Sequence, residues 1–366
     1  MTPLKQEIAT AIAHEGPMTL ERYMALCLAH PRYGYYMTRD PFGAGGDFVT
    51  APEIGSLFGR TLARQAAQIL SSNIPDIVEL GAGSGRLARD LLAGLAKVDS
   101  LPRRYLILET SADLRQRQRE LLRRDLPQLV ERITWLDALP DALDALVIGN
   151  EVLDAMPVHV ITASADSIDE RGVTHDGDEF AWRTRPAAGA LLEAAQKLDL
   201  AAGYTTEISL ASLAFMRTLA QHLRHGVAIL IDYGFPAREY YHPQRASGTL
   251  MCHYRQHAHD DPLCLAGLQD ITAHVDFSAI ADAALQSGLD LLGYTNQAQF
   301  LINCGITDLL AETPADNISA YLPLAAQAQK LMSPAEMGEL FKVIAFGRNH
   351  RVPLAGFASG NKLRLL

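Results

Sequence analysis

The sequence predicts an α/β protein built around a parallel, doubly wound sheet, and two observations support this fold class. Between Asp76 and Asn150, apolar runs of strand length alternate with helical patterns, which is the order of a doubly wound sheet. The first run leads directly into a turn with three alternating glycines, as the first strand of a nucleotide-binding sheet does. With 366 residues, of which 48% are apolar and 20% charged, the chain can bury a large core around this sheet.

The N-terminal region, residues 1 to 75, is predicted to be a mainly helical extension. Thr2 is expected to cap the first helix, and Pro3 suits its first turn. A loop rich in glycine and tyrosine, from Pro31 to Pro52, interrupts the helices. Loops longer than about a dozen residues are often lids or binding segments, so we expect this loop to close over a ligand.

The glycine turn after the first strand discriminates between nucleotide cofactors. A dinucleotide-binding turn needs a small residue three places after its second glycine, and Arg86 occupies that place. Glycines at 81, 83 and 85 instead leave bare backbone that tolerates positive φ and the close approach of a ligand. Glu79 would repel a pyrophosphate, but it can attract the ammonium group of S-adenosylmethionine (SAM). The pattern favours SAM, although such a turn can also be only a tight strand-to-helix connection.

Two further apolar runs end in an acidic residue. The run 104–108 precedes Glu109, whose carboxylate can accept hydrogen bonds from both ribose hydroxyls of an adenosine. This feature alone does not separate SAM from a nicotinamide cofactor. The run 133–136 precedes Asp137, at the place where the adenine amino group would lie, although Asp137 is equally suited to cap the following turn.

The fourth strand leads into a short segment with two carboxylates, Glu151 and Asp154. Ligands of open α/β sheets bind outside the carboxyl ends of the strands, so we expect Asn150 to contact the cofactor and the two acids to contact the substrate. A spacing of three would place both acids on one face of a helical turn. Methyl transfer needs a nucleophile held in line with the methyl carbon, and paired carboxylates can grip an arginine and receive its proton. A structural capping role for these residues remains an alternative.

The predicted core spans residues 76 to 366 and contains two insertions. The first, at about 158–225, is expected to hold a hairpin around the polar turn 175–178, with strand-like runs at 158–161 and 179–184. Two helices should follow the hairpin, at about 188–198 and 207–224.

The sheet resumes with the apolar run 227–232, which ends at Asp232. This aspartate either lines the cleft or caps a turn. A second insertion is predicted at about 234–276. The last two apolar runs, 289–294 and 341–347, are expected to form the antiparallel pair that completes a seven-stranded sheet.

Composition narrows the classes of partner. The formal charge of −10 provides no overall attraction to a phosphate backbone, so we do not expect nucleic acid to be a partner. The basic run Arg115–Arg119, with Arg123 and Arg124, has helical spacing and is interpreted as a solvated helix face. No apolar run is long enough for stable membrane insertion.

The cysteines and the N-terminus predict a cytoplasmic protein. The four cysteines form no C-x-x-C pair, which indicates reduced thiols. The N-terminal residues lack the apolar core of a signal peptide and the pattern of a transit peptide. A cluster of cysteine, histidine and aspartate between Cys252 and Asp261 lacks the spacing of a zinc motif, so no metal site is expected.

Several motifs resemble those of the MidA-like SAM-dependent methyltransferases, a family that includes the mitochondrial complex I assembly factor described as a protein arginine methyltransferase. The resemblance covers almost the whole chain, and its most particular motifs are GGDFVTAPEI and NEVLDAMPVH. The other motifs are RYGYY at 32–36, ELGAGSGRLARDLL at 79–92, IDYGF at 231–235, GTLMCHYRQH at 248–257 and QDITAHVDFSAI at 269–280.

This resemblance implies a class I SAM-methyltransferase fold, with a Rossmann-like seven-stranded sheet and insertions that shape a substrate groove. Many relatives have proline where this chain has Ala82 and differ at Ser84, so the resemblance implies SAM binding but not a rigid turn. It assigns SAM-binding roles to Glu79, Gly81, Gly83, Gly85 and Glu109, and it places Asp47, Phe48, Thr50, Pro52 and Glu53 beside the same pocket.

The leading hypothesis is a SAM-dependent methyltransferase that acts on an arginine of a protein, such as a respiratory complex I subunit. The alternative is a non-catalytic assembly factor that binds SAM and a client protein. A nicotinamide-dependent oxidoreductase is disfavoured by Glu79 and Arg86. The sequence leaves the oligomeric state open.

Overall fold

The computed structural model describes residues 2–38 and 49–366, and it divides the chain into two compact units. Unit 1 consists of Met1–Phe48, Leu153–Phe215 and Phe235–Asp276. Unit 2 consists of Val49–Val152, Met216–Gly234 and Phe277–Leu366. Most of the predicted lid, residues 39–48, lies outside the described residues, and so do Asp47 and Phe48. Residues 49–75, which were predicted to be part of the N-terminal extension, belong to unit 2.

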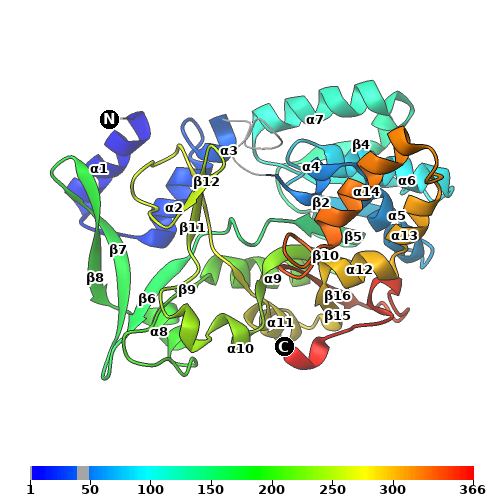
Figure 1. The fold of residues 1–366 in the computed structure, drawn as a ribbon. Coiled ribbons are helices and arrows are strands. Elements are labelled where there is room, and N and C mark those ends of the chain that lie inside the picture. The colour runs from blue at the N-terminus through cyan, green and yellow to red at the C-terminus, as the bar shows by residue number, and fades with distance from the viewer. Residues whose placement is uncertain (1, 39–48) are drawn as a thin grey trace. The chain divides into compact units, whose positions relative to one another are not determined.

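Unit 2 is built on a mixed sheet with the strand order β15-β16-β10-β5-β2-β3-β4 (Figure 1). The central strands are parallel, and β16 is antiparallel to both β10 and β15, which confirms the predicted closing pair. A two-residue strand, β14 (Val275–Asp276), pairs with β10, so among the described residues this sheet has one short strand more than the predicted seven. The other bounds are β2 Asp76–Leu80, β3 Arg104–Leu108, β4 Ile133–Leu136, β5 Leu143–Asn150, β10 Leu223–Phe235, β15 Asp290–Asn296 and β16 Phe341–Arg348.

Continuous apolar runs form the central strands because both faces of this sheet are covered. All five residues of β2 are buried, and so are residues 145–149 of β5 and 226–232 of β10. Helices α5 (Ser56–Leu70) and α6 (Arg86–Lys97) pack closely at Gly94. A Cβ at this position would lie only 2.6 Å from the Cβ of Ala63, so the close approach requires glycine. The other helices of this unit are α4 Ala51–Ile54, α7 Ala112–Asp125, α11 Phe277–Gln286, α12 Gln297–Asn303, α13 Ile306–Ala311 and α14 Ile318–Met332. Short 3-10 helices span Pro127–Arg132, Ala355–Phe357 and Leu363–Leu365.

Unit 1 has its own core, in which α1 and α2 pack against β7 of a second sheet. The oxygen Oγ1 of Thr2 accepts a hydrogen bond from the backbone N–H of Lys5, which confirms the predicted N-cap. The sheet has the order β1-β7-β6-β9 with β8 beside β7, and a three-stranded sheet has the order β12-β11-β13. The helices are α1 Pro3–Glu15, α2 Leu20–Ala29, α3 Tyr35–Thr38, α8 Gly189–Ala195 and α10 Ala237–Tyr240, with a 3-10 helix at Pro243–Arg245.

The predicted hairpin is present, but it is formed by β7 and β8, which meet at Gly177 and Asp178 (Figure 1). Strand β7 was not predicted from the sequence, and residues 207 and 208, which were predicted to be helical, belong to β9. The helix that follows, α9, spans Leu210–His222. The strands are β1 Met18–Thr19, β6 His159–Ala163, β7 Ile168–Asp176, β8 Glu179–Pro186, β9 Thr205–Ile208, β11 Met251–Tyr254, β12 His257–His259 and β13 Asp270–Thr272.

Within the described part of the chain, no helix combines the length and the apolar character needed to cross a membrane.

Candidate functional site

The glycine turn follows β2 directly and has the backbone conformation that the sequence predicts. Gly81, Gly83 and Gly85 have φ values of 61°, 51° and 83°, in the left-handed region that favours glycine. The turn is closed by a hydrogen bond from the N–H of Gly85 to the carbonyl of Ala82 (2.8 Å), and α6 begins at Arg86. At its three glycines the turn therefore presents bare backbone in front of a helix N-terminus.

Glu79 is buried in β2, two residues before this turn. Its side chain accepts a hydrogen bond from the hydroxyl of Tyr105 at 2.7 Å, and the residue is only 2% exposed. Burial raises the pKa of Glu79 to about 7, and the nearby charge of Glu109 acts in the same direction. A buried carboxylate of this kind is stabilised by a ligand that brings a positive charge.

Glu109 lies directly after β3 and is 7% exposed. Its oxygen Oε1 accepts from the backbone N–H of Ser111 (3.0 Å), and Oε2 accepts from the side-chain amide of Gln118 (3.1 Å). Burial raises the pKa of this carboxyl. Because an ionised carboxylate oxygen can accept more than one hydrogen bond, both oxygens can also accept from a ligand hydroxyl.

Asp137 follows β4, but its side chain is 92% exposed and is held by Arg115. The Nη2 atom of Arg115 lies 2.6 Å from Oδ1 of Asp137 and donates to the carbonyl of Leu136 at 2.8 Å. No helix begins after Asp137, so the structure provides no helix for it to cap. Arg115 therefore ties the end of β4 to α7.

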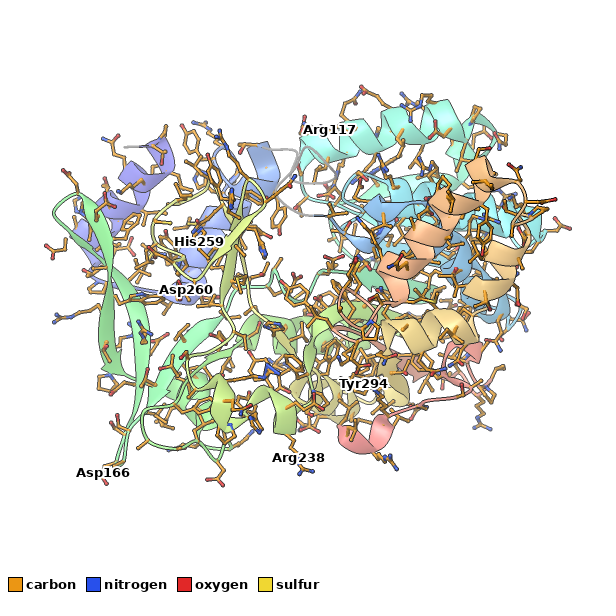
Figure 2. The ribbon with its side chains drawn as sticks, in the orientation of Figure 1. Arg117, Asp166, Arg238, His259, Asp260 and Tyr294 are labelled. Carbon is orange, nitrogen blue, oxygen red and sulfur yellow. The ribbon has the colours of Figure 1, made fainter. Side chains whose placement is uncertain are left out.

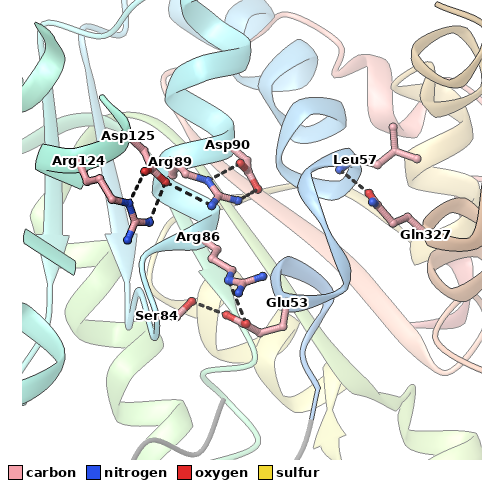
Figure 3. Close-up of polar contacts among 9 residues, drawn as sticks. All are labelled: Glu53, Leu57, Ser84, Arg86, Arg89, Asp90, Arg124, Asp125 and Gln327. Carbon is pink, nitrogen blue, oxygen red and sulfur yellow. Dashed lines mark hydrogen bonds and ion pairs between the residues drawn. The ribbon is translucent and has the colours of Figure 1, made fainter. Parts of the chain in front are cut away.

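Helix α4 places Glu53 against the glycine turn, as Figure 3 shows. The carboxylate of Glu53 accepts a hydrogen bond from the hydroxyl of Ser84 and lies 3.2 Å from Nε of Arg86. The side chain of Glu53 is 5% exposed, and Pro52 and Thr50 in the same segment are buried. Arg86 stands where a dinucleotide-binding turn would need a small residue. The structure shows that it pairs with Glu53, a partner that could not be predicted from the sequence.

The segment after β5 does not form the predicted helical turn. Glu151 has a φ of 54°, and its backbone N–H donates to the carbonyl of Ile231 (2.8 Å). Its side chain accepts from the amide of Asn150 at 2.9 Å. The turn begins only at Leu153, so the argument from a shared helix face for Glu151 and Asp154 is wrong. Pairing with β10 holds the backbone here in its left-handed conformation.

Asp232 lies within β10 and is 1% exposed. Its carboxylate accepts from the backbone N–H groups of Val152 (3.1 Å) and Tyr233 (2.9 Å). It thereby fixes the chain just after Glu151, which agrees with the structural interpretation that the sequence left open.

Asp154 belongs to unit 1, whereas Glu151 belongs to unit 2. The carbonyl of Asp154 accepts a hydrogen bond from the N–H of Ala273 (3.1 Å), and the residue is 6% exposed. In the same unit the hydroxyl of Tyr36 donates to Oδ1 of Asp270 at 2.7 Å. Burial raises the pKa of Tyr36, and the charges of Asp270 and Asp154 raise it further.

Two other polar segments singled out in the sequence are the basic run on α7 and the segment from Cys252 to Asp261. Arg117 on α7 pairs with Asp113 one turn earlier, at 2.8 Å (Figure 2). In the Cys252–Asp261 segment, Cys252 is buried on β11 and lies opposite His259 in the antiparallel pairing of β11 with β12. His259 and Asp260 are labelled in Figure 2. Among the described residues, no group of three or more His, Cys, Asp or Glu side chains is placed to hold a metal ion.

The fold and this site define a class, the doubly wound α/β proteins that bind a nucleotide-type cofactor at a glycine turn. Within that class, residues 60–295 match the model of a family described as S-adenosyl-L-methionine-dependent methyltransferases. The chain belongs to this family. It is a methyltransferase whose cofactor is SAM, which confirms the cofactor and the enzyme class predicted from the sequence.

Individual relatives resemble the chain over most of its length. A crystal structure described as that of a methyl transferase from Burkholderia thailandensis, bound to S-adenosyl-homocysteine, is 48% identical with a TM-score of 0.96, and the match covers 99% of this chain and 96% of that one. The mitochondrial protein arginine methyltransferase NDUFAF7 of Bos taurus is 29% identical, over 98% of this chain and 90% of its own. The NDUFAF7 homologue of Caenorhabditis elegans is 30% identical, over 83% of this chain and 76% of its own.

Proposed function

We propose that this methyltransferase transfers the methyl group of SAM to an arginine side chain of a protein. The observation that carries the proposal is that relatives named protein arginine methyltransferases match nearly the whole chain, up to 98% of it. The acidic residues Glu151 and Asp154 suit such a substrate chemically. A planar guanidinium forms strong, paired hydrogen bonds with carboxylates.

The residues around the glycine turn fit SAM in charge and in shape. We assign the ammonium of SAM to Glu79, because a carboxylate with a raised pKa gains most from a cation. We assign the ribose hydroxyls to Glu109. The backbone of the turn, which carries no Cβ at Gly81, Gly83 or Gly85, allows the methionyl part to approach closely. We further propose that Asn150, Asp137, Thr50, Pro52 and Glu53 line the adenosine and methionyl parts of the site.

In the proposed mechanism, SAM supplies an electrophilic methyl group on its sulfonium, and the protein supplies orientation and a proton acceptor. We assign the guanidinium to Glu151, which holds it so that one nitrogen faces the methyl carbon. That nitrogen bonds to the methyl carbon while the bond from carbon to sulfur breaks, and the electron pair stays on sulfur. Glu151 then accepts the proton that the alkylated guanidinium sheds, and passes it to solvent.

For the client protein we propose a subunit of respiratory complex I, with the reaction taking place in the cytoplasm. The client proposal is supported by the sequence motifs shared with the MidA-like family. The proposed location is supported by the cysteines, since all four are free thiols, as in a reducing compartment. Burial raises the pKa of Cys27 to about 12, so this thiol stays protonated and unreactive.

The decisive experiment is transfer of a labelled methyl group from SAM to extracts of cells that lack this protein, followed by mass spectrometry of the labelled residue. We expect label on arginine, and we expect Glu151→Gln to lower turnover by about 10²-fold, the range for a lost acid-base group. The affinity for S-adenosyl-homocysteine should stay within about twofold, since only transition-state contacts are removed. Glu120→Gln, on the surface of α7, is the control that should retain full activity.

Four outcomes separate the alternatives. Label on lysine, or full activity of a Glu151→Gln, Asp154→Asn double variant, would reject the arginine mechanism. Stable capture of a client without any methyl transfer would favour the non-catalytic assembly factor. Labelled arginine on a protein outside complex I would reject the proposed client but keep the reaction.

A further inference from the structure

Gln118 is a polar residue in the middle of α7 that is completely buried. Its amide nitrogen donates to the carbonyl of Gly83 at 2.9 Å and to Oε2 of Glu109 at 3.1 Å. Its amide oxygen accepts from the indole N–H of Trp135 at 2.8 Å. One side chain therefore contacts the glycine turn, the acid after β3 and the strand β4.

The orientation of this amide follows from the chemistry of its neighbours. An indole N–H can only donate, so the amide oxygen must face Trp135. The amide NH₂ group must then face Gly83 and Glu109, which offer only acceptors. Trp135 thus selects the orientation in which both amide hydrogens are used.

Gln118 also packs against the third glycine of the turn. A Cβ built on Gly85 would lie 3.2 Å from Cγ of Gln118 and 3.4 Å from its Cα, and the φ of Gly85 is 83°. The turn and Gln118 therefore fit each other in shape as well as through the hydrogen bond to Gly83. A shift of α7 would move the turn and the carboxylate of Glu109 together.

We propose that Gln118 is a positioning residue for SAM, which aligns the Glu109 carboxylate toward the ribose and locks the glycine turn at the same time. Gln118 occupies one acceptor site on Oε2, as the backbone of Ser111 does on Oε1, so the carboxylate cannot rotate and its remaining acceptor sites face a fixed direction. This inference rests on the ribose role proposed above for Glu109. It assigns to Gln118 a part in recognising the 2′-hydroxyl without touching it.

The test pairs a change in the protein with a change in the ligand. Calorimetry measures the Kd of S-adenosyl-homocysteine and of its 2′-deoxy analogue for the wild type, Gln118→Met and Gln116→Met. Gln116 is the matched control, because it lies on the same helix, is exposed, and its side chain donates to Glu120 on the surface. We expect Gln118→Met to weaken S-adenosyl-homocysteine about tenfold, the size of one hydrogen bond to a charged group, and Gln116→Met to leave it unchanged.

The decisive quantity is the penalty for removing the 2′-hydroxyl. We expect the 2′-deoxy analogue to bind about tenfold more weakly than S-adenosyl-homocysteine in the wild type and about twofold more weakly in Gln118→Met. The difference is smaller in the variant because a carboxylate that is not aligned no longer bonds well to the ribose. An equal penalty in both proteins would show that Gln118 does not act through Glu109, and would overturn the inference. A wild type indifferent to the 2′-hydroxyl would instead reject the role of Glu109 itself.

A second variant keeps the inference testable if Gln118→Met does not fold. Trp135→Phe retains an aromatic ring but removes the hydrogen bond that orients the amide. We expect the same loss of 2′-hydroxyl discrimination, to a smaller degree, with cooperative unfolding retained. Unchanged discrimination in a folded Trp135→Phe would count against the orienting role of Trp135 and against the inference.

Discussion

The most informative perturbation of this site is a change of pH, because Glu79 titrates near neutrality. In the free protein, burial raises the pKa of Glu79 from its ordinary value of 4.5 to about 7. A bound ammonium group favours the ionised carboxylate, so ligand binding should lower this pKa again. Affinity for S-adenosyl-homocysteine should therefore be full above pH 7 and fall as the pH drops through 7.

The magnitude follows from the fraction of Glu79 that is already ionised. With a pKa of about 7, roughly one carboxyl in eleven is ionised at pH 6 and roughly ten in eleven at pH 8. We therefore expect about tenfold weaker binding at pH 6 than at pH 8, equivalent to about 1.4 kcal/mol. Binding at pH 6 should also release close to one proton.

Titration calorimetry in two buffers of different ionisation enthalpy measures both quantities. Glu79→Gln should bind more weakly, and its affinity should not change between pH 6 and pH 8. Glu109→Gln should also bind more weakly but keep the pH dependence, which separates the two carboxyls. An affinity that is independent of pH in the wild type, without proton release, would refute the assignment of the ammonium to Glu79.

The same carboxyl should lower the stability of the free protein. Because its pKa is higher in the folded state, the folded state binds more protons between pH 4.5 and 7, and its stability falls as the pH rises through that interval. The shift of the Glu79 pKa from 4.5 to about 7 lowers the free energy of unfolding by about 3 kcal/mol, and this loss is present in full above pH 7. Thermal melting at pH 8 should find Glu79→Gln more stable than the wild type, whereas an equal or lower Tm would contradict the shift.

Two further predictions concern the glycine turn. Gly83→Val should weaken the binding of S-adenosyl-homocysteine by at least about tenfold, because a β-branched residue is strained at a φ of 51° and obstructs the ligand. The control is Gly177→Val, which is similarly strained at a φ of 60° but lies in the β7–β8 turn. In the same calorimetric titration this control should bind the ligand normally. Equal affinity of the two variants would remove the glycine turn from the site. Glu53→Ala should remove the ion pair with Arg86 and speed hydrogen exchange in α4 and the glycine turn. The same variant should bind S-adenosyl-homocysteine several-fold more weakly. Exchange rates equal to those of the wild type would show that Glu53 does not hold the turn.

The parts of the fold that the sequence predicted are those with strong local signals. The strands of the central sheet are continuous apolar runs, because both of their faces are buried. An acid lies at the carboxyl end of each of the first two, Glu79 just before the end of β2 and Glu109 just after β3, where ligands of such sheets bind. The positive φ of the three turn glycines was also predictable, since few other residues adopt it without strain.

The parts that escaped prediction depend on neighbours distant in the sequence. Strand β7 is polar, and it forms because β1, β6 and β8 pair with it. The left-handed conformation of Glu151 is held by a carbonyl of β10, which no local propensity encodes. Gln118 lies between arginines in a basic run, yet it is buried and bonded to the glycine turn and Trp135. A signal was present in its helical phase, because Leu114 and Leu122, four residues away on either side, are also buried.

The place of β16 in the sheet has a consequence for synthesis of the protein on the ribosome. Strand β10 ends at Phe235, but its antiparallel neighbour β16 starts only at Phe341. Until β16 emerges, an apolar strand of the nascent chain keeps one edge of its backbone unpaired. Such edges promote association between incomplete chains, so the nascent polypeptide should depend on chaperones until β16 has been synthesised.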